Sequence, residues 1–233
     1  MERLPDDPAR RGRRGGALSR SPGGSLGRKV VLWRHGRTDW NDDNRFQGHI
    51  DIPLNAVGRE QASSAAARLA SLHPEVIVSS DLSRAADTAQ MLADLTGLSV
   101  QQTPQLRETH GGTWEGQYAR DLKDDPLYLE WLSGDDAAAG GSETRSQVGD
   151  RAAAVVREVV AGLSPRGLAV VVSHGGTIRS TLGRMLELPV GQWRVFGGLA
   201  NCCWSVLEEG RRGWRLAEHN AGSLPEAVLG DDR

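Results

Sequence analysis

Three short apolar runs, none interrupted by a polar residue, constrain the fold of this chain more than any other feature. They occupy residues 30–33, 76–78 and 168–172. Unbroken runs rich in β-branched residues are typical of strands that are buried on both faces of a parallel sheet. Because successive parallel strands need a crossover connection, the segments between these runs should contain helices.

The segments between and after the runs fit this expectation. Apolar residues recur there at helical spacing, and Gly, Pro and Ser mark the ends of elements. Helices are predicted over residues 58–72, 83–96, 120–132 with an interruption at Pro126, 144–163 and 176–187; further strands are predicted at 98–102, 202–208 and 214–219. A Gly-Arg-Arg-Gly turn joins the last two strands. The alternation predicts an α/β fold, a three-layer α/β/α arrangement with a mostly parallel central sheet.

A chain of 233 residues is long enough for one such domain, which we expect over residues 28–220. Residues 1–27 carry six arginines among Gly, Ser and Pro, so we expect a disordered extension there. The alternative for this extension is an arm that binds a polyanion such as nucleic acid. Residues 221–233 are expected to form a loose tail.

Composition excludes several classes of partner. The formal net charge is -2, so the chain as a whole has no electrostatic attraction for nucleic acid. No apolar run approaches the length of a membrane helix, and no membrane partner is expected. The two cysteines, Cys202 and Cys203, are neighbours and are not expected to form a disulfide. A reducing compartment suits them, and the expected location is the cytoplasm.

Charged and polar side chains follow each of the three apolar runs. Arg34 and His35 come after the first, Arg84 comes shortly after the second, and His174 comes after the third. Because the carboxyl ends of parallel strands meet at one edge of a sheet, we expect these side chains to form a site there. Glu108, in a separate loop, is the candidate carboxylate for it.

These residue types suit the transfer of a phosphoryl group. Arginine binds phosphate oxygens through two prongs and is always charged. A histidine with a free ring nitrogen can attack phosphorus, and a single carboxyl group can then serve as acid and as base in turn. Backbone N–H groups at a Gly-rich helix start, such as that of Gly175, can add donors to the phosphate. The sequence therefore predicts an enzyme that acts on a small phosphorylated molecule.

Four motifs in this order resemble those of the histidine phosphatase superfamily, the phosphoglycerate-mutase-like proteins. They are Arg34-His35-Gly36 with Thr38 and Asn41, the segment from Ser79-Ser80 to Arg84, Leu106-Arg107-Glu108, and Ser173-His174-Gly175-Gly176. The resemblance covers about residues 29–208. One such tripeptide carries little weight, whereas four ordered motifs at predicted strand ends or loops are specific.

The resemblance implies a role for each matched residue. His35 would be the phosphorylated nucleophile, Glu108 the proton donor and acceptor, and Arg34, Arg84 and His174 the phosphate-binding residues. Asn41 and Gln47 would add contacts to the phosphate or to the leaving group. Family members need no metal or cofactor, and because many of them form dimers, a homodimer is an alternative to a monomer.

The resemblance leaves more than one function open. The region after Glu108 is compact and lacks the basic insertion of cofactor-dependent phosphoglycerate mutases, which favours hydrolysis over a mutase reaction. A non-catalytic module that binds a phosphorylated ligand is the other alternative. The segments 78–82 and 106–110 also resemble a narrower group, the actinobacterial glucosyl-3-phosphoglycerate phosphatases, which makes glucosyl-3-phosphoglycerate the candidate substrate. His110, Trp114 and Trp131 are candidates for the wall of the substrate pocket.

Overall fold

The computed structural model describes residues 27–222 of the chain. The predicted arginine-rich extension and almost all of the predicted C-terminal tail lie outside the described residues. The last described strand ends at Ala221, one residue beyond the predicted end of the domain.

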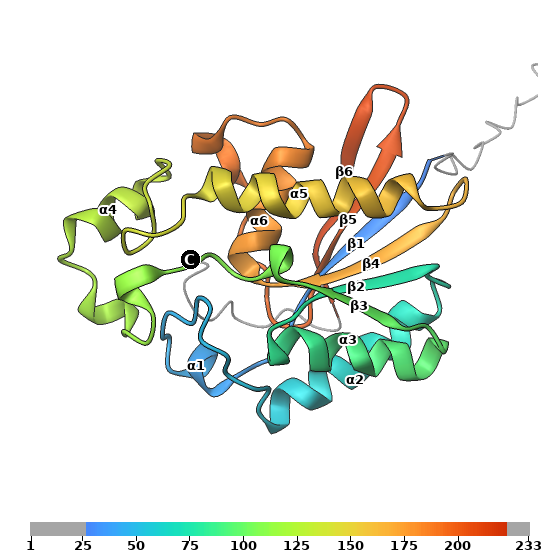
Figure 1. The fold of residues 1–233 in the computed structure, drawn as a ribbon, viewed down its shortest axis with the longest axis horizontal. Coiled ribbons are helices and arrows are strands. Elements are labelled where there is room, and N and C mark those ends of the chain that lie inside the picture. Colours follow the sequence, from blue (N-terminus) through green and yellow to red (C-terminus); the bar gives the residue numbers. More distant parts are fainter. Residues whose placement is uncertain (1–26, 223–233) are drawn as a thin grey trace, which may run out of the picture.

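Six strands form a single sheet in the order β3-β2-β4-β1-β5-β6 (Figure 1). The strands are β1 (Lys29–Arg34), β2 (Val76–Ser80), β3 (Val100–Thr103), β4 (Leu168–Ser173), β5 (Trp204–Gly210) and β6 (Gly213–Ala221). The first four are paired in parallel, whereas β5 runs antiparallel to β1 and to β6. The predicted mostly parallel sheet is confirmed, and the predicted turn between the last two strands falls between Gly210 and Gly213.

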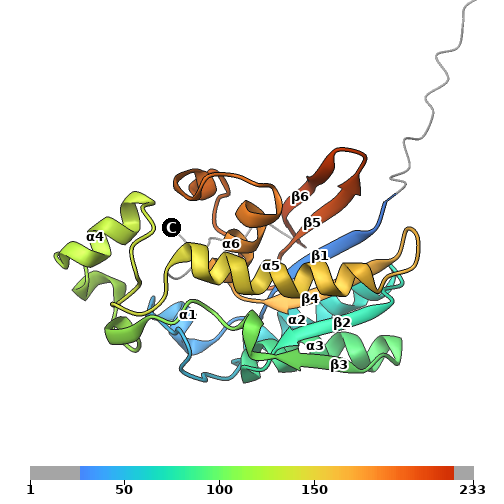
Figure 2. The same ribbon diagram turned by 45° about the horizontal axis from the view of Figure 1, so that its top comes forward.

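Helices cover both faces of this sheet, and the uninterrupted apolar runs explain why. Alternate residues of a strand point to opposite faces. Val31 and Val170 therefore pack beneath α2 (Ala56–Ala70) and α3 (Ser83–Thr96). Their neighbours in the strands pack on the other face, against α5 (Arg145–Ala161) and α6 (Gly175–Met185). Figure 2 shows α5 crossing the strands on that face. Both faces being buried, the strands could not alternate polar and apolar residues.

The interruption predicted at Pro126 within residues 120–132 is confirmed, but the two parts are separate elements. Residues 119–121 form a short 3-10 helix, η3 (Ala119–Asp121), and α4 (Pro126–Ser133) begins at the proline. Proline has no N–H to donate, which suits the first turn of a helix, and the Asp125 carboxylate accepts hydrogen bonds from the amides that follow. A short helix α1 (Asp39–Asp42) was not predicted.

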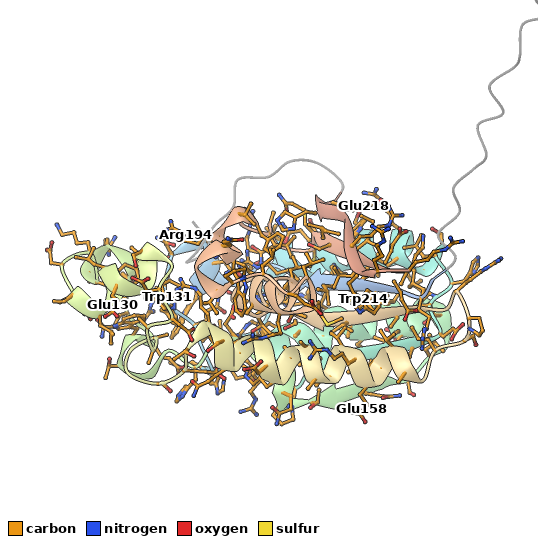
Figure 3. All side chains as sticks on the ribbon, turned by 90° about the horizontal axis from the view of Figure 1, so that it is seen from above. Glu130, Trp131, Glu158, Arg194, Trp214 and Glu218 are labelled. Carbon is orange, nitrogen blue, oxygen red and sulfur yellow. The ribbon has the colours of Figure 1, made fainter. Side chains whose placement is uncertain are left out.

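A small apolar cluster around α4 stands beyond the edge of the sheet at which the parallel strands end (Figure 1). It contains Phe46, Trp114, Tyr128 and Trp131. Arg194, from the 3-10 helix η4 (Val190–Val195), lies beside this cluster (Figure 3) and donates a hydrogen bond to the Leu132 carbonyl. Over residues 27–222, no helix is both long enough and apolar enough to cross a membrane.

Candidate active site

His35 and His174 lie side by side because the strands that precede them are paired. Strands β1 and β4 are parallel neighbours, with Arg34 opposite Ser173 at their carboxyl ends. The two histidines follow directly, and the centroids of their rings are 5.0 Å apart. The structure therefore brings together two side chains that are 139 positions apart in the sequence.

The His35 ring is held in one tautomer. Its Nδ1 lies 2.7 Å from the carbonyl oxygen of Gly36, and because a carbonyl only accepts, Nδ1 carries the proton. The lone pair is then on Nε2. Burial lowers the pKa of His35 well below 6.5, and the positive charges of Arg84 and Arg34 lower it further. The ring is therefore neutral, as a nucleophile must be.

His174 has the opposite arrangement of its two nitrogens. Its Nδ1 accepts a hydrogen bond of 3.2 Å from Nε of Arg84, so its proton is on Nε2. Burial, followed by the charge of Arg84, lowers the pKa of His174 well below 6.5 and keeps the ring neutral. Nε2 is buried and has no hydrogen-bond partner among the described residues. Since a buried donor without a partner is costly, this N–H is suited to an oxygen of a ligand.

Two buried guanidinium groups are held beside the histidines. Arg84 is fully buried and donates to the carbonyls of Ile50 and Gly48, each at 2.9 Å. Arg34 is 2 % exposed and donates to the carbonyl of Leu199. Carbonyl acceptors orient a guanidinium without cancelling its positive charge, so both groups are suited to bind an anion.

The carboxylate of Glu108 lies at the first turn of α6. One oxygen accepts hydrogen bonds from the amides of Thr109, at 2.8 Å, and Thr177, at 3.0 Å. The other accepts from the amide of Gly176 at 3.1 Å. Because His174 is the N-cap of this helix, one helix start positions a phosphate-binding candidate and the carboxylate together. The backbone amides at this helix start therefore fix the position of both carboxylate oxygens.

Asn41 and Gln47 belong to one hydrogen-bond network beneath His35. The Asn41 carboxamide oxygen accepts from the amide of Thr38 at 3.1 Å and from Nδ2 of Asn201 at 3.2 Å. The Gln47 oxygen lies 3.1 Å from the Thr38 hydroxyl. Asn201 also donates to the His35 carbonyl at 3.1 Å. With both carboxamide oxygens occupied by donors, the NH₂ groups are the ends suited to phosphate oxygens.

Sequence reasoning assigned no role to three members of this site, although Thr38 belongs to the first of the four motifs. Thr38 forms a capping box with Asn41, and a threonine three residues before a polar residue is a signal that could have indicated it. Thr177, whose hydroxyl lies 3.1 Å from a Glu108 oxygen, sits in the predicted first turn of a helix. Asn201 had no local signal, because it reaches the site only through the packing of the loop before β5.

The candidates for the pocket wall separate into two groups. Trp114 and Trp131 are 1 % and 5 % exposed and pack within the α4 cluster, and their contact with substrate stays a prediction. His110 is about half exposed and lies against His49, with ring centroids 4.7 Å apart. Within residues 27–222, no group of three or more histidine, cysteine or acidic side chains is arranged to hold a metal ion.

Neutral histidines beside buried guanidinium groups serve phosphoryl transfer, because the cations stabilise the phosphoryl charge while the uncharged ring attacks phosphorus. Together with the α/β sheet, whose strand ends carry these groups, they are the features of a phosphatase.

The chain belongs to the histidine phosphatase superfamily, branch 1, whose sequence profile matches residues 30–222. A glucosyl-3-phosphoglycerate phosphatase of Mycolicibacterium vanbaalenii is 39% identical over 215 residues, which cover 84% of this chain and 96% of the relative. A metal-independent phosphoserine phosphatase of Arabidopsis thaliana is 34% identical over 192 residues, 80% of this chain and 78% of the relative. The solved structure of mycobacterial glucosyl-3-phosphoglycerate phosphatase with VO3 matches with a TM-score of 0.79 and 41% identity, over 84% of this chain and 100% of that one.

Proposed function

We propose that this phosphatase hydrolyses glucosyl-3-phosphoglycerate through a phosphohistidine on Nε2 of His35. The neutral His35 ring carries the proposal, since its Nδ1 proton is engaged and its Nε2 lone pair is available beside two buried arginines. The relatives that bear the name of this activity, at 39% and 41% identity over most of the chain, support the choice of substrate.

In the first step, Nε2 of His35 forms a bond to phosphorus and the bond between phosphorus and the leaving oxygen breaks. The leaving alkoxide takes a proton from the carboxyl group of Glu108. Arg34, Arg84 and the Nε2–H of His174 stabilise the charge on the phosphoryl oxygens. Once it has lost its proton, the Glu108 carboxylate is stabilised by the amides of α6.

In the second step, a water molecule attacks the phosphorus of the phosphohistidine and transfers a proton to Glu108. The bond between phosphorus and nitrogen breaks, and its electron pair returns to Nε2 of His35. Inorganic phosphate leaves, and the carboxyl group is protonated again for the next cycle. One carboxyl group therefore acts as general acid and then as general base.

A mutase reaction is the second candidate. It would differ only in the acceptor, since a sugar acid instead of water would take the phosphoryl group from His35. The short segment between Glu108 and α4 favours hydrolysis. A location in the cytoplasm and a homodimeric state also remain part of the proposal. The two buried cysteines, neither of which forms a disulfide among the described residues, are consistent with a reducing compartment.

The test is phosphate release from a panel of phosphomonoesters by the wild-type protein and by His35→Ala. The panel contains glucosyl-3-phosphoglycerate, 3-phosphoglycerate, phosphoserine, a sugar phosphate and a nucleoside monophosphate. We expect the highest kcat/KM for glucosyl-3-phosphoglycerate, and a loss of at least about a thousandfold in the variant because the nucleophile is removed.

Other outcomes would contradict parts of the proposal. A higher kcat/KM for another ester would overturn the assignment of glucosyl-3-phosphoglycerate as the substrate but would not affect the proposed mechanism. Turnover retained by His35→Ala would overturn the phosphohistidine. Interconversion of phosphoglycerates without phosphate release would indicate the mutase. Binding of a panel member without any turnover would indicate the non-catalytic module.

A further inference from the structure

The backbone that carries Glu108 is held by side chains from four other parts of the chain. Each carbonyl from residue 105 to residue 108 accepts a hydrogen bond from a side chain. The donors are Ser173 to Leu106, Thr177 to Arg107, His49 to Glu108, and Arg151 to Gln105, Arg107 and Glu108. Loop carbonyls commonly bind solvent, so such complete engagement by side chains indicates a segment whose position matters.

Arg151, in the first half of α5, supplies the largest share of these bonds. Its NH1 donates to the carbonyls of Gln105 and Arg107, both at 2.7 Å, and its NH2 donates to the carbonyl of Glu108 at 2.9 Å. Its remaining N–H groups, on Nε and NH2, donate to the two oxygens of Glu143 at 2.7 and 2.9 Å. All five N–H groups of this guanidinium are therefore used.

The ion pair with Glu143 sets the orientation of this guanidinium. The side chains of Arg151 and Glu143 are 15% and 17% exposed, so solvent competes little for either. Burial by itself raises the pKa of Glu143, but its hydrogen bond with Arg151 and the bond from the His110 amide outweigh this and lower it. Glu143 is therefore ionised at neutral pH and accepts hydrogen bonds from Nε and NH2 of Arg151. This leaves the opposite edge of the guanidinium facing residues 105–108.

No hydrogen bond joins Arg151 to the Glu108 carboxylate, whose oxygens are bound by amides of α6 and of Thr109. The carboxylate oxygens thus depend on α6, and the backbone from which the side chain extends depends on Arg151 together with Ser173, Thr177 and His49. Because Arg151 supplies three of the six side-chain bonds to this backbone, its loss should let the segment shift along α6. A displacement of about 1 Å in a catalytic group can cost about a hundredfold in rate.

We infer that Arg151 is a positioning residue that places Glu108 for proton transfer, through the carbonyls of residues 105–108. This inference rests on the proposed function, because it assigns Arg151 an effect on the proton that Glu108 gives to the leaving group. Glu143 assists by orienting the guanidinium. Neither residue touches the reacting atoms.

The test compares kcat/KM for two aryl phosphates that differ in leaving group. Phenolate is strongly basic and needs a proton as it leaves, whereas 4-nitrophenolate leaves without one. Since kcat/KM covers only the steps up to transfer of phosphate to His35, the later hydrolysis does not enter. We expect Arg151→Met to lower kcat/KM for phenyl phosphate about tenfold more than for 4-nitrophenyl phosphate.

Arg157→Met is the matched control. Arg157 is exposed on the same helix, next to Glu158, which Figure 3 labels on the outer side of α5. Its substitution should leave the ratio of the two kcat/KM values unchanged. A purely structural effect of Arg151→Met would lower both values by the same factor, since it would only reduce the fraction of folded enzyme, and that result would overturn the inference.

Two further variants complete the experiment. If Arg151→Met does not fold, Glu143→Gln decides, because it weakens the orienting pair and should shift the ratio in the same direction. In a Glu108→Gln background, Arg151→Met should not change the ratio further if it acts through Glu108; an additional change would contradict the inference. If the wild-type protein hydrolyses neither ester, the proposed function itself is overturned. If the wild-type protein is active and Arg151→Met leaves the ratio of the two kcat/KM values unchanged, only the role of Arg151 is overturned.

Discussion

At the residue scale, His35 and His174 owe their suitability to burial rather than to any direct bond to an acid. Both rings are almost inaccessible, and both have their pKa lowered well below 6.5, first by burial and then by Arg84. Placing positive charges beside a histidine destabilises its protonated form. The same cations that we propose to hold the phosphate therefore keep the proposed nucleophile uncharged.

This lowering predicts how stability depends on pH. In the unfolded chain a histidine has a pKa near 6.5 and is protonated below that pH, whereas the buried ring in the folded protein stays neutral. The unfolding free energy therefore falls as the pH falls below about 6.5. Between about pH 7.5 and about pH 5.5, each such histidine should cost on the order of 1 kcal/mol of unfolding free energy. His49 and His219, whose pKa values burial also lowers, add to this loss, whereas the carboxylates with lowered pKa titrate below this window. Urea unfolding at the two pH values measures the loss, which we expect to be at least about 2 kcal/mol for the wild type.

His35→Asn is the control for that measurement. Whatever it does to absolute stability, it removes one of the two buried rings, and its loss between the two pH values should be smaller by on the order of 1 kcal/mol. Equal losses in the variant and the wild type would show that His35 is not held neutral.

At the element scale, the first turn of α6 links the phosphate site to the carboxylate. Gly175 and Gly176 open the helix, and the structure places the Glu108 oxygens against its amides. A side chain at Gly176 would enter the space that the carboxylate occupies. A Cβ there would lie 2.8 Å from Oε1 of Glu108 and 3.3 Å from Oγ1 of Thr109.

Gly176→Ala should therefore separate activity from stability. Alanine suits a helix better than glycine by up to about 1 kcal/mol, and the atom it meets is the end of a flexible side chain that can move. We expect an unchanged or raised unfolding free energy but a kcat/KM for phenyl phosphate lower by about tenfold, because Glu108 is displaced. Gly191→Ala, whose Cβ would meet nothing within 4 Å, is the control and should alter neither quantity. Full activity in Gly176→Ala would indicate that proton transfer does not require this position of Glu108.

At the scale of the whole molecule, one sheet separates two apolar cores, and a third cluster around α4 lies apart from both. The core beneath α5 and α6 contains Leu182, which is fully buried. Stability should reside in the two large cores, because they bury the most apolar surface and contain the central strands.

Leu182→Ala should therefore lower the unfolding free energy by about 3 kcal/mol, since it leaves a cavity in a packed core. Leu129→Ala, at a position 52% exposed on α4, should change it by less than about 0.5 kcal/mol. Urea unfolding of the two variants provides the measurement. A similar loss in both variants would mean that the α4 region unfolds together with the main domain and contributes equally to its stability.

Much of this molecule follows from local patterns in the sequence. The apolar runs predicted β1, β2 and β4 because a strand buried on both faces is mostly apolar. The polar residues after those runs were expected at one edge, and the structure places Arg34, His35, Arg84 and His174 there. Such predictions succeed because they depend on the chemistry of neighbouring residues and on a general property of parallel sheets.

Tertiary packing decided the remainder. Arg151 lies in a predicted helix with no signal that it would reach the carbonyl of Glu108, 43 positions earlier. Asn201 donates a hydrogen bond to Asn41 only because the loop before β5 packs against the end of β1. The sequence by itself determined which groups the protein can use and at which edge of the sheet they gather, since short-range preferences suffice for that. Which nitrogen carries each proton, and what holds Glu108 in place, was decided by contacts between distant segments, which form only when the cores pack.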